Sequence, residues 1–358
     1  MLQDRSKLLF LTTTLFILTC GSSGFAQSGS RNSAPSPSSA PPALPPAAPS
    51  GSFSPQQQPF SPPAVVPFQQ QQQLGPIGPQ NIAPQFPAQQ PTAQPAGVPQ
   101  QAGSVWEMHN SQSIQTVDHS SWDYFLSRYV RRDAKGLNRV CYRHVTREDY
   151  QVLQGYLLYL QSVDVRALNR REQLAYWLNL YNAQTVAIVV CHQPLWSIRQ
   201  IKSKPLDFVG PFDDKAVTVL GQNLSLSDIE NDIVRAVFKD PRIHYALNCA
   251  SVGCPNLQQT AWQSVNLEQR LDAAAFEFVN SGRAFKATLF GVKLSSIYKW
   301  YADDFGGNDA AVLQHLRRYA TPQNYQVLSR YHQVMHYYYD WSLNVSGKGS
   351  NIYGVLLP

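Results

Sequence analysis

The stretch Asn169-Arg170-Arg171-Glu172-Gln173-Leu174-Ala175-Tyr176-Trp177-Leu178-Asn179-Leu180-Tyr181-Asn182-Ala183 decides the fold, because it predicts one long, buried helix. Asn169 is a helix-capping residue, and Glu172 stands three positions later, where the partner in a capping box stands. Apolar residues then cover nearly every side of the helix as far as about Val190, a pattern typical of a helix inside a core.

Shorter elements follow and precede this central helix. Helices are expected at 122–130, from the Thr146 cap to residue 160, from Ser227 with its capping-box partner Glu230 to residue 238, at 267–279 and at 297–301. Segments 215–226 and 285–294 predict β-hairpins, and 242–248 predicts a buried strand. Helices and hairpins without βαβ alternation predict an α+β fold, with a central buried helix, hairpins and a mostly antiparallel sheet.

The first 104 residues differ from the rest in composition. Arg5 and Lys7 precede a short apolar run, and small residues precede Gln27, so residues 1–26 are expected to be a cleaved signal peptide. Lipidation at Cys20 is an alternative. Residues 27–104 contain 19 of the 26 prolines and predict a disordered Pro/Gln-rich linker. Residues 105–358 are expected to form a single globular domain.

Charge and targeting limit the partners that we expect. The net charge is +6, with no run of Lys or Arg, so no nucleic-acid partner is expected. The apolar run is too short for a transmembrane helix, so the signal peptide meets the membrane only transiently. The protein is therefore predicted to be extracytoplasmic, in the periplasm, cell envelope or secreted, with cell-wall material or a peptide as candidate ligand and no cofactor.

Four cysteines remain after the predicted cleavage: Cys141, Cys191, Cys249 and Cys254. In an oxidising compartment a Cys249–Cys254 disulfide would staple the loop after the predicted strand, leaving Cys141 and Cys191 to pair or to stay buried as thiols. Alternatively, Cys249 is a nucleophile with His244 as its base and loop N–H groups as its oxyanion hole. His244 and Cys249 have opposite parity along a regular strand, so a bulge or another histidine would be needed. A zinc site of His244, Cys249 and Cys254 is a third alternative, although no fourth ligand is evident and no metal is expected.

Other polar residues are candidates for a pocket or a buried polar network. Asn179 and Asn182 share a face of the central helix, and buried amides must be hydrogen-bonded, which favours a structural role. The capping box accounts for Glu230, and Arg235 could form a buried ion pair. The full candidate network is Asn179, Asn182, Glu230, Arg235, Asn248, Asp304 and Asp340.

Five blocks of sequence resemble the domain-of-unknown-function 547 family over residues of about 165–345. The blocks are 176–183, 226–235, 240–255, 294–305 and 339–344. Asn231 departs from the family pattern, in which His follows the Ile-Glu pair. The resemblance implies a shared fold, which we associate with papain- and transglutaminase-like folds, and a shared site around Asn182, Glu230, His244 and Cys249. It implies no particular activity.

Two functions remain open at this point. The first is an exported binding or structural module with a cleft around Cys249. The second is a thiol-dependent hydrolase or acyl-transferase that uses Cys249 as its nucleophile. The state of the Cys249 thiol separates the two.

Overall fold

The structure is a computed structural model that describes residues 104–201 and 210–346. The predicted signal peptide and linker, including Cys20, lie outside the described residues. Helix α3 (Arg170–His192) is the predicted central helix, and nearly all its side chains are buried. Among the described residues it is the one helix long and apolar enough to cross a membrane, a test that a buried core helix also passes.

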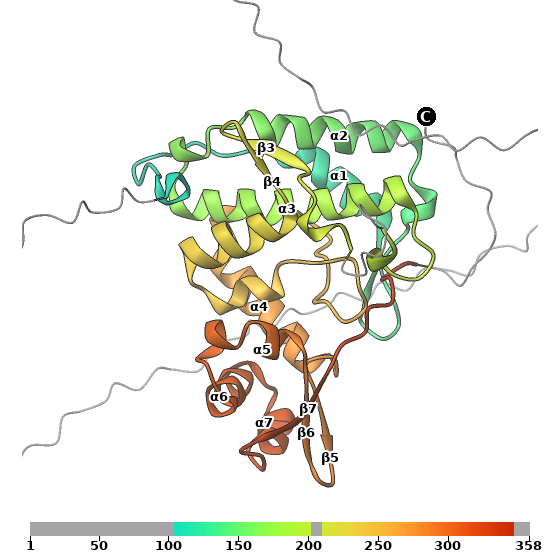
Figure 1. The fold of residues 1–358 in the computed structure, drawn as a ribbon, viewed down its shortest axis with the longest axis vertical. Helices are drawn as coiled ribbons and strands as arrows, with labels where there is room; N and C mark the ends of the chain where they lie inside the picture. The colour runs from blue at the N-terminus through green and yellow to red at the C-terminus, as the bar shows by residue number, and fades with distance from the viewer. Residues whose placement is uncertain (1–103, 202–209, 347–358) are drawn as a thin grey trace, which may run out of the picture. The chain divides into compact units, whose positions relative to one another are not determined.

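Two further helices form a layer beside α3. Helix α2 (Arg147–Ser162) runs alongside it, and α1 (Ser120–Tyr129) packs on α2 (Figure 1). The predicted cap at Thr146 is confirmed, because its hydroxyl accepts the N–H of Asp149 at 3.1 Å. In the chain, the short hairpin of β1 (Val130–Arg132) and β2 (Asn138–Val140) connects α1 to the segment that precedes α2.

The capping box predicted at the start of α3 is half formed. The Asn169 side chain accepts the N–H of Glu172 at 3.0 Å, as predicted. The Glu172 carboxylate, however, accepts the N–H of Val117 at 2.8 Å instead of returning a bond to Asn169. Glu172 therefore fixes the N-terminal segment of the domain onto the central helix.

The capping box predicted for Ser227 and Glu230 is wrong. The reciprocal pair is Ser225 and Asp228, since the Ser225 hydroxyl accepts the N–H of Asp228 at 3.1 Å and the Asp228 carboxylate accepts the N–H of Ser225 at 2.6 Å. The helix that follows, η6 (Asp228–Phe238), is π-helical and packs on α3. Glu230 is therefore not needed as a cap.

The strand predicted at 242–248 is also wrong. Residues Pro241–Tyr245 form the 3-10 helix η7, which starts where the Asp240 carboxylate accepts the N–H of Arg242 at 2.8 Å. A short apolar run cannot be assigned to strand or helix by its pattern alone, and here η7 packs against α4 (Leu267–Asn280). The parity argument about His244 and Cys249 therefore does not apply.

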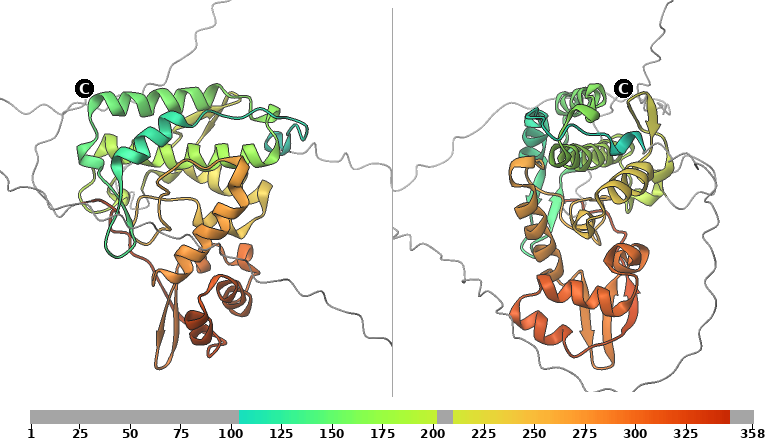
Figure 2. Two further views of the ribbon diagram at one scale, coloured as in Figure 1. Left: turned by 180° about the vertical axis from the view of Figure 1, so that it is seen from behind. Right: turned by 90° about the vertical axis from the view of Figure 1, so that its left-hand side faces the viewer.

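The strands form three small sheets, which agrees with the predicted α+β class. Both predicted hairpins are present, as β3 (Val217–Val219) with β4 (Gln222–Leu224) and β5 (Phe285–Thr288) with β6 (Gly291–Ser295). Strand β7 (Val334–Tyr338) joins β6 in parallel, so this sheet is mixed. Figure 2 shows the sheet with the last helices at the end of the domain away from α2.

Short helices complete the described part of the chain. They are η1 (Val105–Glu107), η2 (Tyr142–His144), η3 (Val165–Ala167), η4 (Ile198–Gln200), η5 (Pro211–Asp213), η8 (Ser264–Asn266), α5 (Ile297–Trp300), η9 (Ala302–Phe305), α6 (Asp309–Tyr319) and α7 (Pro322–Leu328). Helix α5 follows β6 as predicted, whereas α6, α7 and β7 had no counterpart in the sequence prediction.

Candidate functional site

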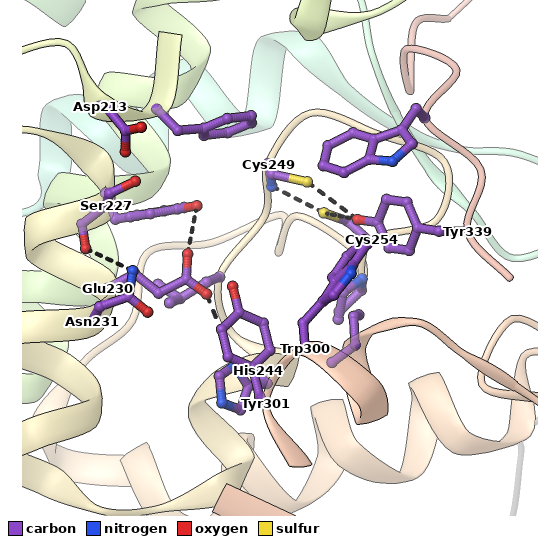
Figure 3. Close-up of a pocket in the computed structure, with 16 residues that line it drawn as sticks. Asp213, Ser227, Glu230, Asn231, His244, Cys249, Cys254, Trp300, Tyr301 and Tyr339 are labelled. Atoms are coloured by element: carbon purple, nitrogen blue, oxygen red, sulfur yellow. Dashed lines mark hydrogen bonds and ion pairs between the residues drawn. The ribbon is translucent and has the colours of Figure 1, made fainter. Parts of the chain in front are cut away.

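A pocket of about 250 Å³ opens beside residues 249–254, which we call the thiol loop (Figure 3). Its walls come from α3, η5, η6, η7, α5 and the chain after β7, so segments far apart in the sequence meet there. We call it the thiol pocket. The residues that line it are Tyr181, Phe212, Asp213, Ser227, Glu230, Asn231, His244, Leu247, Cys249, Cys254, Pro255, Ile297, Trp300, Tyr301, Tyr339 and Trp341.

Asn182 fixes the backbone that leads into the thiol loop. Its side-chain amide donates to the carbonyl of Ala246 at 2.9 Å and accepts the N–H of Asn248 at 2.9 Å. Asn179 does the same for a different segment, since it bonds both the carbonyl (2.8 Å) and the N–H (2.9 Å) of Trp262. Both amides are buried, so they act as structural clamps and do not line the thiol pocket.

Asn248 closes the thiol loop from within. Its side chain accepts the N–H of Ala250 at 2.9 Å and donates to the carbonyl of Pro255 at 2.7 Å. Ala250 has a positive φ of 62°, which lets the chain turn sharply after Cys249.

The chain after β7 covers the other side of the thiol loop. The N–H of Val252 donates to the carbonyl of Ser342 at 2.7 Å, and that of Gly253 donates to the carbonyl of Asp340 at 2.8 Å. A Cβ at Gly253 would lie 2.9 Å from the backbone nitrogen of Asp340, so only glycine permits this approach. Asp340, a predicted network residue, contributes through its backbone, and its exposed side chain accepts the N–H of Ser342.

Cys249 and Cys254 are free thiols in this structure, so the predicted disulfide between them is not formed. Cys254 Sγ accepts the N–H of Cys249 at 3.0 Å and lies 3.0 Å from the Tyr339 hydroxyl and 3.5 Å from the Ser251 hydroxyl. Cys249 Sγ lies 3.2 Å from each of the same two hydroxyls. Cys141 is also a free thiol, so it does not pair with Cys191.

These contacts move the two thiol pKa values in opposite directions. The hydrogen bond with Cys254, together with burial, raises the pKa of Cys249 well above its ordinary value. Burial alone would raise the pKa of Cys254, but hydrogen bonds from Cys249, Ser251 and Tyr339 outweigh it and lower this pKa to about 6. Of the two thiols, Cys254 is therefore the one that loses its proton more easily.

Five of the six N–H groups of the thiol loop are not free to form the predicted oxyanion hole. The N–H groups of Cys249, Ala250, Val252, Gly253 and Cys254 all donate to acceptors within the domain. An oxyanion hole needs N–H groups that point at the reacting atom. Acyl chemistry at Cys249 would therefore need the N–H of Ser251 or donors from outside the thiol loop.

His244 lies in the same pocket, but the structure does not pair it with Cys249 (Figure 3). Its Nε2 lies 2.6 Å from Asp304 Oδ2, and its Nδ1 lies 3.9 Å from Glu230 Oε1. The ring stacks on Tyr301 at 4.0 Å, and its side chain is 1% exposed. His244 is thus held between two carboxylates.

Glu230, a member of the predicted pocket network, lines the thiol pocket. Its carboxylate accepts the Tyr181 hydroxyl at 3.1 Å (Figure 3). Burial raises the pKa of both Tyr181 and Tyr301, and the neighbouring Glu230 raises them further. Both phenols therefore stay protonated and can donate to this carboxylate.

Arg235 forms the predicted ion pair, and its partner is Asp304. The guanidinium binds the carboxylate through two bonds of 2.6 and 3.1 Å. Burial alone would raise the pKa of Asp304, but His244 and Arg235 hold it well below the ordinary value. Asn231 lines the pocket and accepts a bond from Arg235 at 2.9 Å.

The structure brings together Cys249, Cys254, His244 and Glu230 around one pocket, with Arg235 and Asp304 beside it. The predicted zinc alternative is not supported, because no group of three or more His, Cys, Asp or Glu side chains in the described part of the chain could hold a metal ion. Sequence reasoning missed the hydroxyls of Ser251 and Tyr339 and the aromatic wall of the pocket. The run Tyr339-Asp340-Trp341 was a signal for that wall, but nothing in the sequence indicated which loop it would cover.

Comparison with known proteins supports the resemblance proposed from the sequence. Residues 165–279 match the model of a family described as "Protein of unknown function, DUF547". The match includes Glu230, His244, Cys249 and Cys254, whereas the wall residues from Trp300 onward lie beyond it. No curated protein and no solved structure matches the chain.

Proposed function

We propose that this DUF547 domain is an exported ligand-binding module, and that its ligand occupies the thiol pocket. The composition of the pocket wall carries the proposal. Of the lining residues that the structure describes, six are Trp, Tyr or Phe, two are the carboxylates Glu230 and Asp213, and none is Lys or Arg. Aromatic pockets with a few convergent polar groups are typical binding sites for small ligands.

The aromatic wall offers ring faces for stacking. Trp300, Tyr339 and Trp341 pack against one another, with ring centroids 4.7 to 5.7 Å apart, and Trp300 remains 47% exposed. Such faces bind cationic groups through the ring quadrupole and also stack on flat apolar faces of a ligand.

The charge of the pocket favours a ligand that carries an amine. Arg235 neutralises Asp304, but in the described part of the chain no Lys or Arg forms an ion pair with Glu230, whose neighbours are the Tyr181 hydroxyl and His244. A protonated amine would pair with the Glu230 carboxylate while its carbon skeleton contacts the rings. Peptides and amino sugars of cell-wall material have this chemistry, which agrees with the predicted export.

Calorimetric titration with soluble cell-wall fragments tests this proposal. We expect binding that is lost when the amines of the fragments are acetylated, and that weakens at least about tenfold in Glu230→Gln, because an uncompensated charge pair costs more than 1.4 kcal/mol. Glu148→Gln, which removes an exposed carboxylate in α2, is the matched control and should bind like the wild type. Equal binding of amine and acetylated fragments would contradict the proposal.

A thiol-dependent hydrolase or acyl-transferase is the second candidate. The association with papain- or transglutaminase-like folds is part of this second proposal. It is favoured by Cys249, a free thiol in the same pocket as His244 and Glu230. Incubation with thioester-forming activated esters, followed by mass spectrometry, tests it. Acylation of Cys249 that is lost in His244→Ala would favour the hydrolase over the binding module.

A further inference from the structure

We propose that Cys249 and Cys254 are a redox-active pair whose disulfide form oxidises thiols that reach the thiol pocket, with Cys249 as the attacked sulfur and Cys254 as the leaving thiolate. This activity goes beyond ligand binding, and it does not depend on which ligand the pocket holds.

The two sulfurs have different surroundings. Cys254 is 4% exposed, and around its sulfur lie one backbone N–H and two hydroxyls at 3.0 to 3.5 Å. Both cysteines line the pocket, but of the two only Cys249 is partly exposed. An incoming thiol therefore reaches Cys249 first, while Cys254 sits where a negative charge is already solvated by the protein.

A half-buried cation, Arg283, adds to this stabilisation. Arg283 donates to the carbonyl of Cys254 at 2.5 Å, and its Nη2 has no hydrogen-bond partner among the described residues. Cations and hydrogen-bond donors beside a cysteine favour its thiolate. The pKa of about 6 for Cys254 agrees with this geometry.

A stabilised thiolate makes the corresponding disulfide easier to reduce, because it lowers the free energy of the reduced state and leaves that of the disulfide unchanged. At pH 7, the equilibrium constant for reducing the disulfide is roughly tenfold larger when the released thiol has a pKa of about 6 than when it has its ordinary pKa. The Cys249–Cys254 disulfide is therefore expected to be an oxidant, in contrast to a structural bridge that resists reduction.

The reaction balances without a metal or a cofactor. A substrate thiolate attacks Cys249 Sγ, the Cys249–Cys254 bond breaks, and its electron pair leaves on Cys254. A second substrate thiolate then attacks the substrate sulfur of the mixed disulfide and expels Cys249, which takes up a proton. Two substrate thiols become one disulfide, the protein pair becomes the dithiol seen here, and an organic disulfide in the surroundings restores the bridge by the reverse exchange.

Glutathione is the probe that tests the proposal on the mature exported chain. The protein is equilibrated at pH 7 with mixtures of reduced and oxidised glutathione, quenched with acid and alkylated, and the state of each cysteine is mapped by mass spectrometry. We expect the Cys249–Cys254 bridge to form and to be reduced again by millimolar reduced glutathione. A bridge that survives excess reduced glutathione, or one that never forms, would overturn the proposal.

Two variants test the roles of the sulfurs and of Tyr339. In Cys254→Ala, glutathione should accumulate as a mixed disulfide on Cys249, and its absence there overturns the assignment. If this variant does not fold, the same mixed disulfide is sought in acid-trapped wild type. Tyr339→Phe should move the equilibrium between dithiol and disulfide toward the disulfide by up to about tenfold. Tyr337→Phe is the control and should leave this equilibrium unchanged, because the Tyr337 hydroxyl donates to Asp309 instead. An unchanged equilibrium in Tyr339→Phe contradicts the role given to its hydroxyl.

Discussion

Replacing Asn182 by leucine tests how the central helix positions the thiol loop. Leucine has the same branched heavy-atom skeleton as asparagine and suits an apolar helix, so by composition alone the change should be harmless. In the structure it removes one donor and one acceptor at a site where Asn182 is 1% exposed. The carbonyl of Ala246 and the N–H of Asn248 each lose the bond that Asn182 gives them.

The expected cost follows from these two bonds. A buried polar group left without a partner costs about 1–3 kcal/mol, so two such groups cost about 2–6 kcal/mol. Burial of the added apolar surface returns about 1 kcal/mol. The net loss of about 1–5 kcal/mol corresponds to a melting temperature lower by roughly 3–15 °C for a domain of this size.

Thermal and urea unfolding measure this loss, and a thiol assay shows where it acts. Asn179→Leu is the matched control, because it removes the same two kinds of bond on the same helix but at Trp262. Both variants should be destabilised, whereas only Asn182→Leu should speed the alkylation of Cys249 and Cys254 in the folded protein. An unchanged melting temperature for Asn182→Leu, or equal effects of the two variants on the thiols, would refute this reasoning.

Three further predictions concern the loop, the ion pair and the N-terminal segment. Gly253→Ala should destabilise the domain by about 1–3 kcal/mol, since its Cβ would meet the backbone of Asp340, whereas Gly155→Ala, with open space around it in α2, should stabilise by about 0.5–1 kcal/mol in the same unfolding assay. The folded-state pKa of Asp304 is lowered, so its contacts stabilise the domain above its ordinary pKa of 3.8 and this stability is lost as the pH falls below that value. Asp304→Asn should therefore lose about 1–3 kcal/mol of unfolding free energy at pH 7 but show a weaker fall in stability from pH 5 to pH 3. Asp303→Asn changes an exposed neighbour and should behave like the wild type. Parallel pH profiles of Asp304→Asn and the wild type would contradict this. N-terminal sequencing of the exported protein should begin near Gln27, and limited proteolysis should remove residues up to about 104; a protease-resistant fragment that starts well inside the linker would count against it.

The sequence predicted the elements whose local signals are strong. The central helix, the Asn169 and Thr146 caps and both hairpins are present because capping residues and periodicity act over a few positions. It failed where a choice between neighbours depended on tertiary packing. Ser225, and not Ser227, takes part in the reciprocal cap, and Asp240 with Pro241 starts a 3-10 helix where the apolar run indicated a strand.

The site was predicted in its residues but not in its contacts. Cys249, His244 and Glu230 do meet around one pocket, yet His244 is paired with Asp304, and Cys249 with Ser251 and Tyr339. Tyr339 lies 90 residues beyond Cys249 in the chain, and backbone contacts of the thiol loop with Asp340 and Ser342, including the close approach at Gly253, hold it there. Such a contact depends on three-dimensional packing, which no local pattern encodes.

The pKa of Cys254 tests the account most directly, because the assignment of Cys254 as the leaving thiolate depends on it. Ultraviolet absorbance of thiolate is recorded as a function of pH for the reduced wild type, and the same titration of Cys254→Ala is subtracted. The account predicts a difference signal with an apparent pKa near 6 that moves upward in Tyr339→Phe. A difference signal that appears only above pH 8, at the pKa of an ordinary thiol, would contradict it.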